Sequence, residues 1–129
     1  MANELVLIVE DNEKNRKLER DVLQFQGYQI IETDNAEEGI RLARERRPAL
    51  ILMDLHLPGI DGIEALGRLR SDPETKRIPV IAVTASAMTE DNRKIVAAGF
   101  DGLQTKPIHV KEFLRAVGDM IARFEGKAA

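Results

Sequence analysis

Short apolar runs alternate along the chain with segments in which apolar residues recur every three or four positions. The apolar, β-branched runs predict strands, and the wider spacing predicts amphipathic helices. The predicted strands cover residues 4–9, 28–33, 49–54, 78–84 and 101–106. The predicted helices cover residues 12–27, 35–47, 62–72, 89–99 and 110–124. Each predicted strand is therefore followed by a predicted helix.

This alternation predicts a parallel sheet with helices on both faces. The strands read as nearly continuous apolar runs, which fits strands buried on both sides. The chain has 129 residues, the length of one ordinary domain, and no linker-like stretch divides it. We expect a single three-layer, doubly wound α/β domain over residues 1–125, a short C-terminal tail at 126–129, and no output domain.

Apolar spacing also predicts which helix faces meet the sheet. The expected core positions are Leu18, Val22 and Phe25 in the first helix and Ile63, Leu66 and Leu69 in the third. Gly27 and Gly99 come directly after helical patterns and predict where the first and fourth helices end.

The composition narrows the possible functions. A net charge of -3 and a pI near 5.5 argue against nucleic acid or a membrane surface as the main partner. The chain has no cysteine, which excludes disulfides, a thiolate nucleophile and zinc–cysteine sites. No apolar run approaches the ~20 residues of a membrane helix, and the acidic N-terminal segment does not resemble a secretion signal. We expect a cytoplasmic protein.

Charged and hydroxyl side chains close four of the predicted strands. Glu10 and Asp11 follow the first strand, Asp54 ends the third, Thr84 ends the fourth and Lys106 ends the fifth. In open α/β sheets, ligands bind outside the carboxyl ends of the strands. These residues are therefore expected to share one edge of the sheet.

The residue types at this edge suit phosphoryl chemistry. Asp11 and Asp54 would repel each other unless a cation lay between them, and oxygen ligands without His or Cys favour Mg²⁺. Lys106 supplies a positive charge and Thr84 a hydroxyl donor, and both suit a phosphoryl group. A carboxylate can itself act as the nucleophile and form an aspartyl phosphate.

Each of these residues also has a plainer interpretation. Asp54 could be a turn residue, Glu10 and Asp11 could cap the first helix, and Lys106 could be an ordinary surface charge. Their shared position at strand ends favours the site. His56 and His109 stand far apart in a chain without cysteine, so we expect no zinc site.

Four motifs at these strand ends resemble the receiver domain of response regulators in two-component signalling. They are VEDN at 9–12, ILMDLHLPGIDG at 51–62, VIAVTASA at 80–87 and QTKPI at 104–108. The resemblance covers essentially the whole chain. It implies a flavodoxin-like (βα)5 fold with strand order 2-1-3-4-5. The NEKNRK and TASAM segments are most similar to DivK-type single-domain regulators and to hybrid-kinase receivers.

The resemblance implies a phosphoryl acceptor beside a magnesium site. Asp54 matches the phosphoacceptor, and Asp11 matches the direct Mg²⁺ ligand. Glu10 matches the second acid, which usually acts through water. His56 matches the position whose backbone carbonyl completes the metal shell. Because His56 lies two residues after Asp54, we also hypothesise that its side chain influences hydrolysis of the phosphoaspartate.

The resemblance also assigns a set of switch residues. Thr84 matches the hydroxyl that moves to the phosphoryl group, and Lys106 matches the lysine that bridges acceptor and phosphate. The peptide bond from Lys106 to Pro107 matches one that is usually cis. The switch aromatic of the family is replaced here by Leu103, which puts an aromatic flip in doubt. Ser86 is expected to assist Thr84 in gating the attacking water.

The function expected from these features is that of a stand-alone response regulator rather than an enzyme with an outside substrate. A histidine kinase or a histidine phosphotransfer protein would donate the phosphoryl group, with Mg²⁺ as cofactor. The fourth helix, fifth strand and fifth helix would then bind a downstream protein, in a monomer or a weak dimer.

Four alternatives remain open at this point. The chain could be a receiver cut from a hybrid histidine kinase, a metal-dependent phosphatase, or a scaffold that has lost phosphorylation. It could also be a flavodoxin-like domain that binds a flavin or nucleotide. That last alternative predicts a glycine-rich phosphate loop after the first strand, where this chain has the acidic VEDNEKN.

Overall fold

The computed structural model describes residues 3–57, 59–85 and 89–128, with the backbone alone at 89–92 and 125–128. Five strands alternate with five helices. The strands are β1 (Leu5–Val9), β2 (Gln29–Thr33), β3 (Leu50–Asp54), β4 (Val80–Thr84) and β5 (Gly102–Thr105). The helices are α1 (Glu13–Phe25), α2 (Ala36–Arg46), α3 (Gly62–Ser71), α4 (Thr89–Ala98) and α5 (Val110–Ala128).

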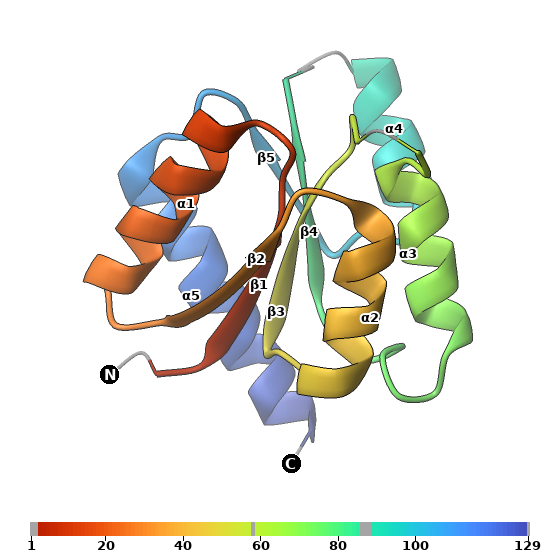
Figure 1. Ribbon diagram of the computed structural model, residues 1–129, viewed down its shortest axis with the longest axis horizontal. Coiled ribbons are helices and arrows are strands. Elements are labelled where there is room, and N and C mark those ends of the chain that lie inside the picture. Colours follow the sequence, from red (N-terminus) through yellow and green to blue (C-terminus); the bar gives the residue numbers. More distant parts are fainter. Residues whose placement is uncertain (1–2, 58, 86–88, 129) are drawn as a thin grey trace.

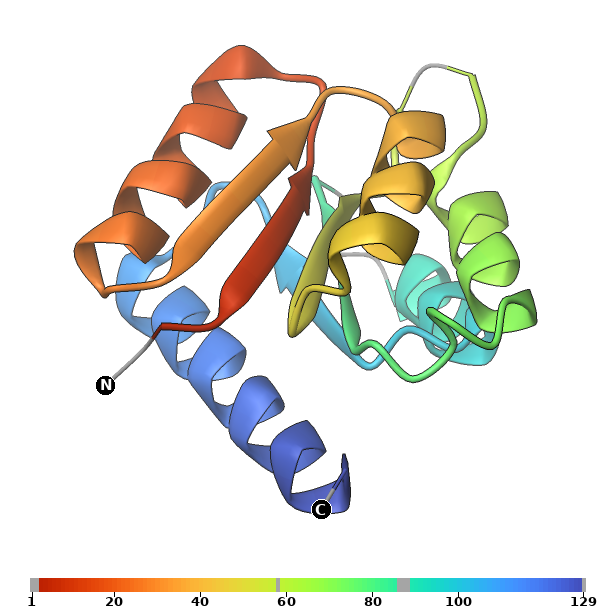
Figure 2. The same cartoon turned by 60° about the horizontal axis from the view of Figure 1, so that its bottom comes forward.

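All neighbouring strands run parallel, in the order β2-β1-β3-β4-β5. Helices α1 and α5 cover one face of this sheet, and α2, α3 and α4 cover the other (Figure 1). The turned view in Figure 2 shows the same two helical layers on either side of the strands. The doubly wound, single-domain α/β fold expected from the sequence is confirmed.

Two apolar clusters fill the spaces between the sheet and its helical layers. Alternate residues of each central strand contribute to opposite clusters, as the two-residue period of a strand requires. Leu7, Ile51 and Met53 pack under α2, α3 and α4. Ile8 and Leu52 pack under α1 and α5. Strands β3 and β4 are buried at every position, so the edge where they end is rigidly placed.

The face of α1 that packs on the sheet differs from the predicted one. Phe25 is 93% exposed and Leu18 is 39% exposed, whereas Glu19 and Leu23 are buried. Val22, the third predicted core position, packs partly buried against the cluster under α1 and α5. The stripe of α1 that faces the sheet therefore contains a carboxylate four residues before Leu23. The hydrophobic pattern assigns charged residues to the solvent side of a helix. Because Glu19 is charged in the sequence, the pattern predicted the wrong face of α1 as the buried one.

Two smaller expectations about helices also required correction. Ile63 lies at the start of α3 and is 43% exposed, although Leu66 and Leu69 are buried as predicted. Helix α5 continues to Ala128, whereas the sequence predicted an end at residue 124 and a frayed tail. Most residues from 125 to 128 have high helix propensity, so the helix continues through them.

The predicted helix ends are otherwise confirmed. Gly27 and Gly99 follow α1 and α4 with φ angles of 106° and 103°, a conformation that glycine adopts without strain. Among the described residues, no helix is long and apolar enough to span a membrane.

Candidate functional site

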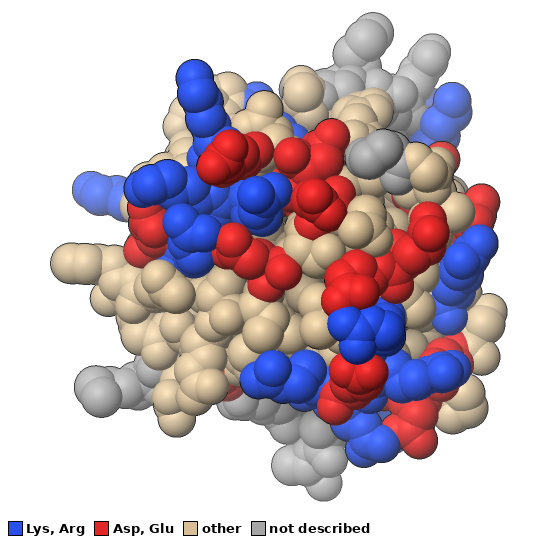
Figure 3. All heavy atoms as spheres, in the orientation of Figure 1, with Lys and Arg blue, Asp and Glu red and all other residues tan. Residues whose placement is uncertain are grey.

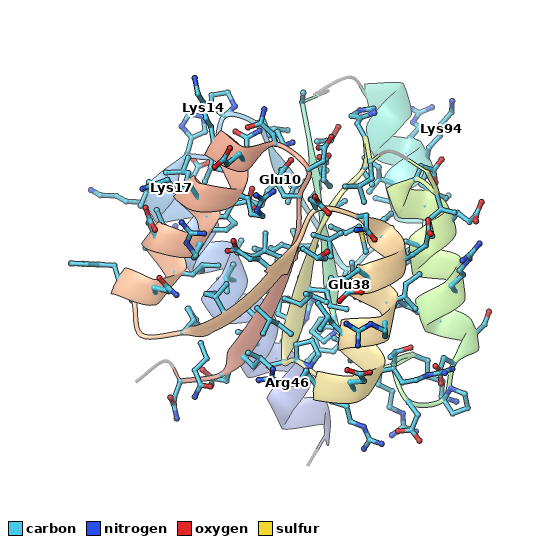
Figure 4. The ribbon with its side chains drawn as sticks, in the orientation of Figure 1. Glu10, Lys14, Lys17, Glu38, Arg46 and Lys94 are labelled. Carbon is cyan, nitrogen blue, oxygen red and sulfur yellow. The ribbon has the colours of Figure 1, made fainter. Side chains whose placement is uncertain are left out.

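Three carboxylates gather at the carboxyl edge of the central strands. Glu10 and Asp11 directly follow β1, and Asp54 ends the neighbouring strand β3. One oxygen from each of these side chains lies within 4.8 Å of the others. Figure 4 shows Glu10 at this edge, between α1 and the strand ends, and Figure 3 shows acidic side chains at the same edge. The sequence prediction that these acids meet is confirmed.

The loop from β1 to α1 fixes the position of Glu10. The Glu10 amide donates to the carbonyl of Thr33, and its own carbonyl accepts from Nη1 of Arg16 at 2.9 Å. The Asn12 amide donates to Oε2 of Glu10 at 3.1 Å. The Asn12 side chain in turn caps α1 by accepting from the amide of Asn15. The side chain of Glu10 is 1% exposed, so these contacts hold a buried acid in place.

Asp54 lies at the base of the same edge and is 2% exposed. Its Oδ1 accepts from the amide of His56 at 3.0 Å. Helix α3 begins unusually close to it. A Cβ atom added to Gly62 would lie 2.8 Å from the carbonyl oxygen of Asp54 and 3.0 Å from Cα of Leu55. Glycine at this position therefore allows α3 to pack directly against the backbone of Asp54.

Lys106 provides the positive charge of the site. Its Nζ lies 2.9 Å from Oε1 of Glu10 and 3.3 Å from Oδ2 of Asp54. The Lys106 amide donates to the carbonyl of Thr84 at 2.8 Å, which joins the ends of β4 and β5. The peptide bond between Lys106 and Pro107 is cis.

The site keeps its acceptor ionised and its lysine charged. Burial raises the pKa of Asp54. Three contacts together lower it by more: the hydrogen bond with Glu10, the hydrogen bond from the His56 amide and the charge of Lys106. The pKa of Asp54 therefore lies below its ordinary value. Burial and then hydrogen bonding with Asp54 raise the pKa of Glu10 to about 7. Burial lowers the pKa of Lys106, but its bonds and charge contacts with Glu10 and Asp54 keep it above the ordinary value.

The other residues that the sequence assigned to the site lie around Asp54 and along β4 and β5, except for one outside the described residues. Thr84 is buried at the end of β4, one residue beyond the partner of Asp54 in the sheet register. His56 is exposed, and its backbone amide is the group that contacts Asp54. Leu103 lies within β5 and packs, partly buried, against the cluster under α2, α3 and α4. Ser86 lies outside the described residues.

Sequence reasoning missed a further acid beneath this site. Glu19 of α1 is 1% exposed, and its Oε2 has no hydrogen-bond partner within the described part of the chain. Burial first, and then the negative charge of Glu10, raise the pKa of Glu19 to about 8. The available signal was the helical spacing from Leu23 back to Glu19, which places both on one face.

Glu19 predicts a measurable pH dependence of stability. Its pKa rises from 4.5 to about 8 on folding, so between these values the folded protein holds a proton that the unfolded chain has lost. The free energy of unfolding therefore falls as pH rises through this window. We expect the stability of Glu19→Gln relative to wild type to rise by about 3 kcal/mol between about pH 5 and pH 8. Urea unfolding at both pH values measures it, and a difference that does not change with pH would refute it.

The donor set of the three acids fits a magnesium ion. It offers carboxylate oxygens, without nitrogen or sulfur ligands, and one side of it is open, because Asp11 is exposed while Glu10 and Asp54 are buried. Mg²⁺ prefers one or two carboxylates and retains several waters. Glu10, Asp11 and Asp54 would hold it.

Comparisons with known proteins agree with this geometry. The family described as the response regulator receiver domain matches residues 6–118. The polar-differentiation response regulator DivK of Brucella anthropi is 48% identical over 112 residues, which cover 87% of this chain and 91% of that protein.

Solved structures give the same picture. The receiver domain of the sensor histidine kinase PA1611 from Pseudomonas aeruginosa PAO1, with a magnesium ion coordinated in the active site cleft, superposes with a TM-score of 0.87. It is 31% identical, and the match covers 94% of this chain and 99% of that one. The chemotaxis response regulator CheY4 of Vibrio cholerae shares the fold, with a TM-score of 0.86 at 24% identity over 92% of this chain and 99% of that one.

Proposed function

The chain belongs to the response regulator receiver domain family, and we propose that it accepts a phosphoryl group on Asp54 in an Mg²⁺-dependent reaction. The observation that carries this proposal is the buried carboxylate of Asp54, which lies 3.3 Å from the Lys106 ammonium beside two further acids. The proposed donor is a phosphohistidine of a histidine kinase or of a histidine phosphotransfer protein. The domain turns over no outside substrate.

In the proposed reaction, an Oδ atom of Asp54 attacks the phosphorus of the donor in line with the leaving nitrogen. The new O–P bond forms as the P–N bond breaks, and its electron pair returns to the imidazole of the donor. Lys106 neutralises charge on the phosphoryl oxygens, and the His56 amide orients the acceptor. Mg²⁺ held by Glu10, Asp11 and Asp54 supplies further neutralisation when it is bound.

Phosphorylation then changes the balance of charges at the strand ends. We propose that the Thr84 hydroxyl and the Lys106 ammonium move to the new phosphoryl group, and that Ser86 and His56 influence its hydrolysis. Because Lys106 and Leu103 belong to β5 and its end, this movement biases a protein-binding face formed by α4, β5 and α5. A leucine at position 103 would report the state by a change of packing.

The proposed context is a stand-alone cytoplasmic regulator. The 91% coverage of the DivK relative supports this choice, because that protein is itself of receiver size. The second candidate is a receiver that acts within a hybrid histidine kinase. This candidate is supported by the 31% identity between this chain and the receiver domain of the sensor histidine kinase PA1611.

Incubation with Mg²⁺ and acetyl phosphate tests the proposal. Wild type is expected to gain the mass of one phosphoryl group, and Asp54→Asn is expected to gain none, because an amide is not a nucleophile for this reaction. Asp61→Asn is the matched control, because Asp61 caps α3 a few residues further along the same loop and should leave the gain intact. Equal gain in wild type and Asp54→Asn would reject Asp54 as the acceptor.

A further inference from the structure

An arginine of α1 contacts the backbone of the proposed metal site and takes no part in the proposed reaction. Nη1 of Arg16 donates to the carbonyl oxygen of Glu10 at 2.9 Å. Nε of the same guanidinium lies 3.5 Å from Oε1 of Glu32 in β2. The side chains of Arg16 and Glu32 are 21% and 28% exposed, so water screens their contact only in part. Arg16 therefore joins the loop after β1 to an acid on the neighbouring strand.

An ordinary ion pair between α1 and β2 does not account for both contacts of Arg16. Arg20 already supplies such a pair, since its Nη1 lies 2.8 Å from Oε1 of Glu32. Arg16 makes a contact of a second kind, because it also donates to the Glu10 carbonyl. A guanidinium is a planar fork with donors on several edges, and this shape lets one side chain hold a carbonyl and a carboxylate together.

The Glu10 carbonyl belongs to the peptide unit that leads into Asp11. A peptide unit is planar, so a restraint on its oxygen also fixes the direction in which the N–H and Cα of Asp11 leave the strand. The preceding peptide unit is held by the sheet, because the Glu10 amide donates to the Thr33 carbonyl at 3.0 Å. The two peptide units that flank Glu10 are therefore held by β2 and by Arg16, respectively.

Asp11 is the acid of the site that depends most on its backbone for orientation. Glu10 and Asp54 are buried, whereas Asp11 is exposed. Packing limits the rotation of a buried side chain, but an exposed side chain must be ordered when its ligand binds. Mg²⁺ demands nearly ideal octahedral geometry from its ligands. A backbone that already points Asp11 toward the other two acids lowers the cost of this ordering.

We propose that Arg16, anchored by Glu32, is a positioning residue that orients the peptide unit between Glu10 and Asp11 and so prepares Asp11 to bind Mg²⁺. This inference rests on the proposed function, because it concerns the metal site of the proposed phosphoryl acceptor. The charge of Arg16 acts in the opposite direction, since a cation near the site repels Mg²⁺. Positioning and charge therefore predict opposite changes in Mg²⁺ affinity when Arg16 is removed.

Calorimetric titration of the unphosphorylated protein with magnesium chloride tests this inference. We expect Arg16→Met to raise the Kd for Mg²⁺ about threefold to tenfold, because the support of a metal ligand is lost. Arg20→Met is the matched control, since it removes the other arginine from Glu32. Its Kd should stay within about twofold of wild type. Unchanged or tighter Mg²⁺ binding by folded Arg16→Met overturns the inference.

A second variant keeps the test decisive if Arg16→Met folds poorly. Arg16→Lys retains the positive charge but replaces the planar fork with a single ammonium. We expect it to raise the Kd for Mg²⁺ in the same direction, by about twofold to fourfold. A Kd equal to that of wild type in Arg16→Lys would show that charge alone matters at this position, and would overturn the inference.

A measurement on the metal-free protein completes the test. The amide ¹⁵N shift of Asp11 reports hydrogen bonding at the preceding carbonyl, which is that of Glu10. We expect Arg16→Met to move this signal and Arg20→Met to leave it in place, and an unmoved signal in Arg16→Met would refute the positioning role. If wild type binds Mg²⁺ but gains no phosphoryl group, the proposed function fails by itself, and the Kd values still decide the role of Arg16.

Discussion

Lys106→Met is expected to destabilise the protein by about 2–4 kcal/mol at about pH 8 in the absence of divalent cations. The ammonium contacts two acids that are 1% and 2% exposed, and methionine would leave both buried without a counter-charge. We also expect phosphoryl acceptance to slow by at least about tenfold, because a preorganised charge at the reacting oxygens is lost. Urea unfolding and intact-mass kinetics measure the two effects.

The loss of stability should respond to pH and to magnesium. Because the pKa of Glu10 is raised to about 7, this acid takes a proton as pH falls below that value and needs Lys106 less. The defect should therefore shrink toward about pH 5, and added Mg²⁺ should reverse part of it at about pH 8. Lys111→Met is the matched control, because Lys111 is exposed on α5. Equal destabilisation at both positions would contradict the assigned role of Lys106.

Gly62→Ala is expected to destabilise the protein by about 2–3 kcal/mol. The added methyl would meet the Asp54 carbonyl oxygen at 2.8 Å and Cα of Leu55 at 3.0 Å, and neither backbone atom can move without shifting the end of β3. The same shift displaces the acceptor, so phosphoryl gain should slow as well. Urea unfolding together with the intact-mass assay checks both results.

Gly67 offers a control within the same helix. A Cβ atom there meets nothing within 4 Å, so Gly67→Ala should stabilise α3 by about 0.5–1 kcal/mol. It should leave phosphoryl acceptance unchanged. If Gly62→Ala behaves like Gly67→Ala, then close packing of α3 on the acceptor strand does not position Asp54.

The parts of the site that the sequence predicted share one property, which is their place at a strand end. A buried parallel strand is recognisable from its apolar run, and the residue that ends it must emerge at the carboxyl edge. The positions of Asp54 and Lys106 at this edge were predicted from the ends of the third and fifth strands. Their contact follows from the parallel order of β3, β4 and β5, which brings the ends of these strands together.

Glu19 could not be found by the same reasoning. Its burial depends on how α1 is rotated against the sheet, and the apolar residues Leu18 and Phe25 indicated the wrong rotation. The hydrophobic pattern of a helix fixes its inward face only when charged residues stay outside. An acid that is buried beside a site on another element breaks this rule, and local sequence does not reveal that placement.

The close approach of α3 to Asp54 was also beyond the sequence pattern. Gly62 reads as part of a turn, because Asp61 and Gly62 directly precede a helical segment. The structure gives this glycine a packing role, since only the absence of a side chain lets α3 begin beside the Asp54 carbonyl. Distances between elements decide this role, and they follow from tertiary packing rather than from local preference.

Borohydride trapping tests most directly whether Asp54 carries the phosphoryl group. An aspartyl phosphate is an acyl phosphate, which borohydride reduces to homoserine, so the site is marked in the chain. After incubation with Mg²⁺ and acetyl phosphate, reduction and peptide mapping should find homoserine at position 54 in wild type. The mark should be absent when Mg²⁺ is chelated. Homoserine at position 11 or 61 instead, or none at all in protein that has gained a phosphoryl group, would contradict the account.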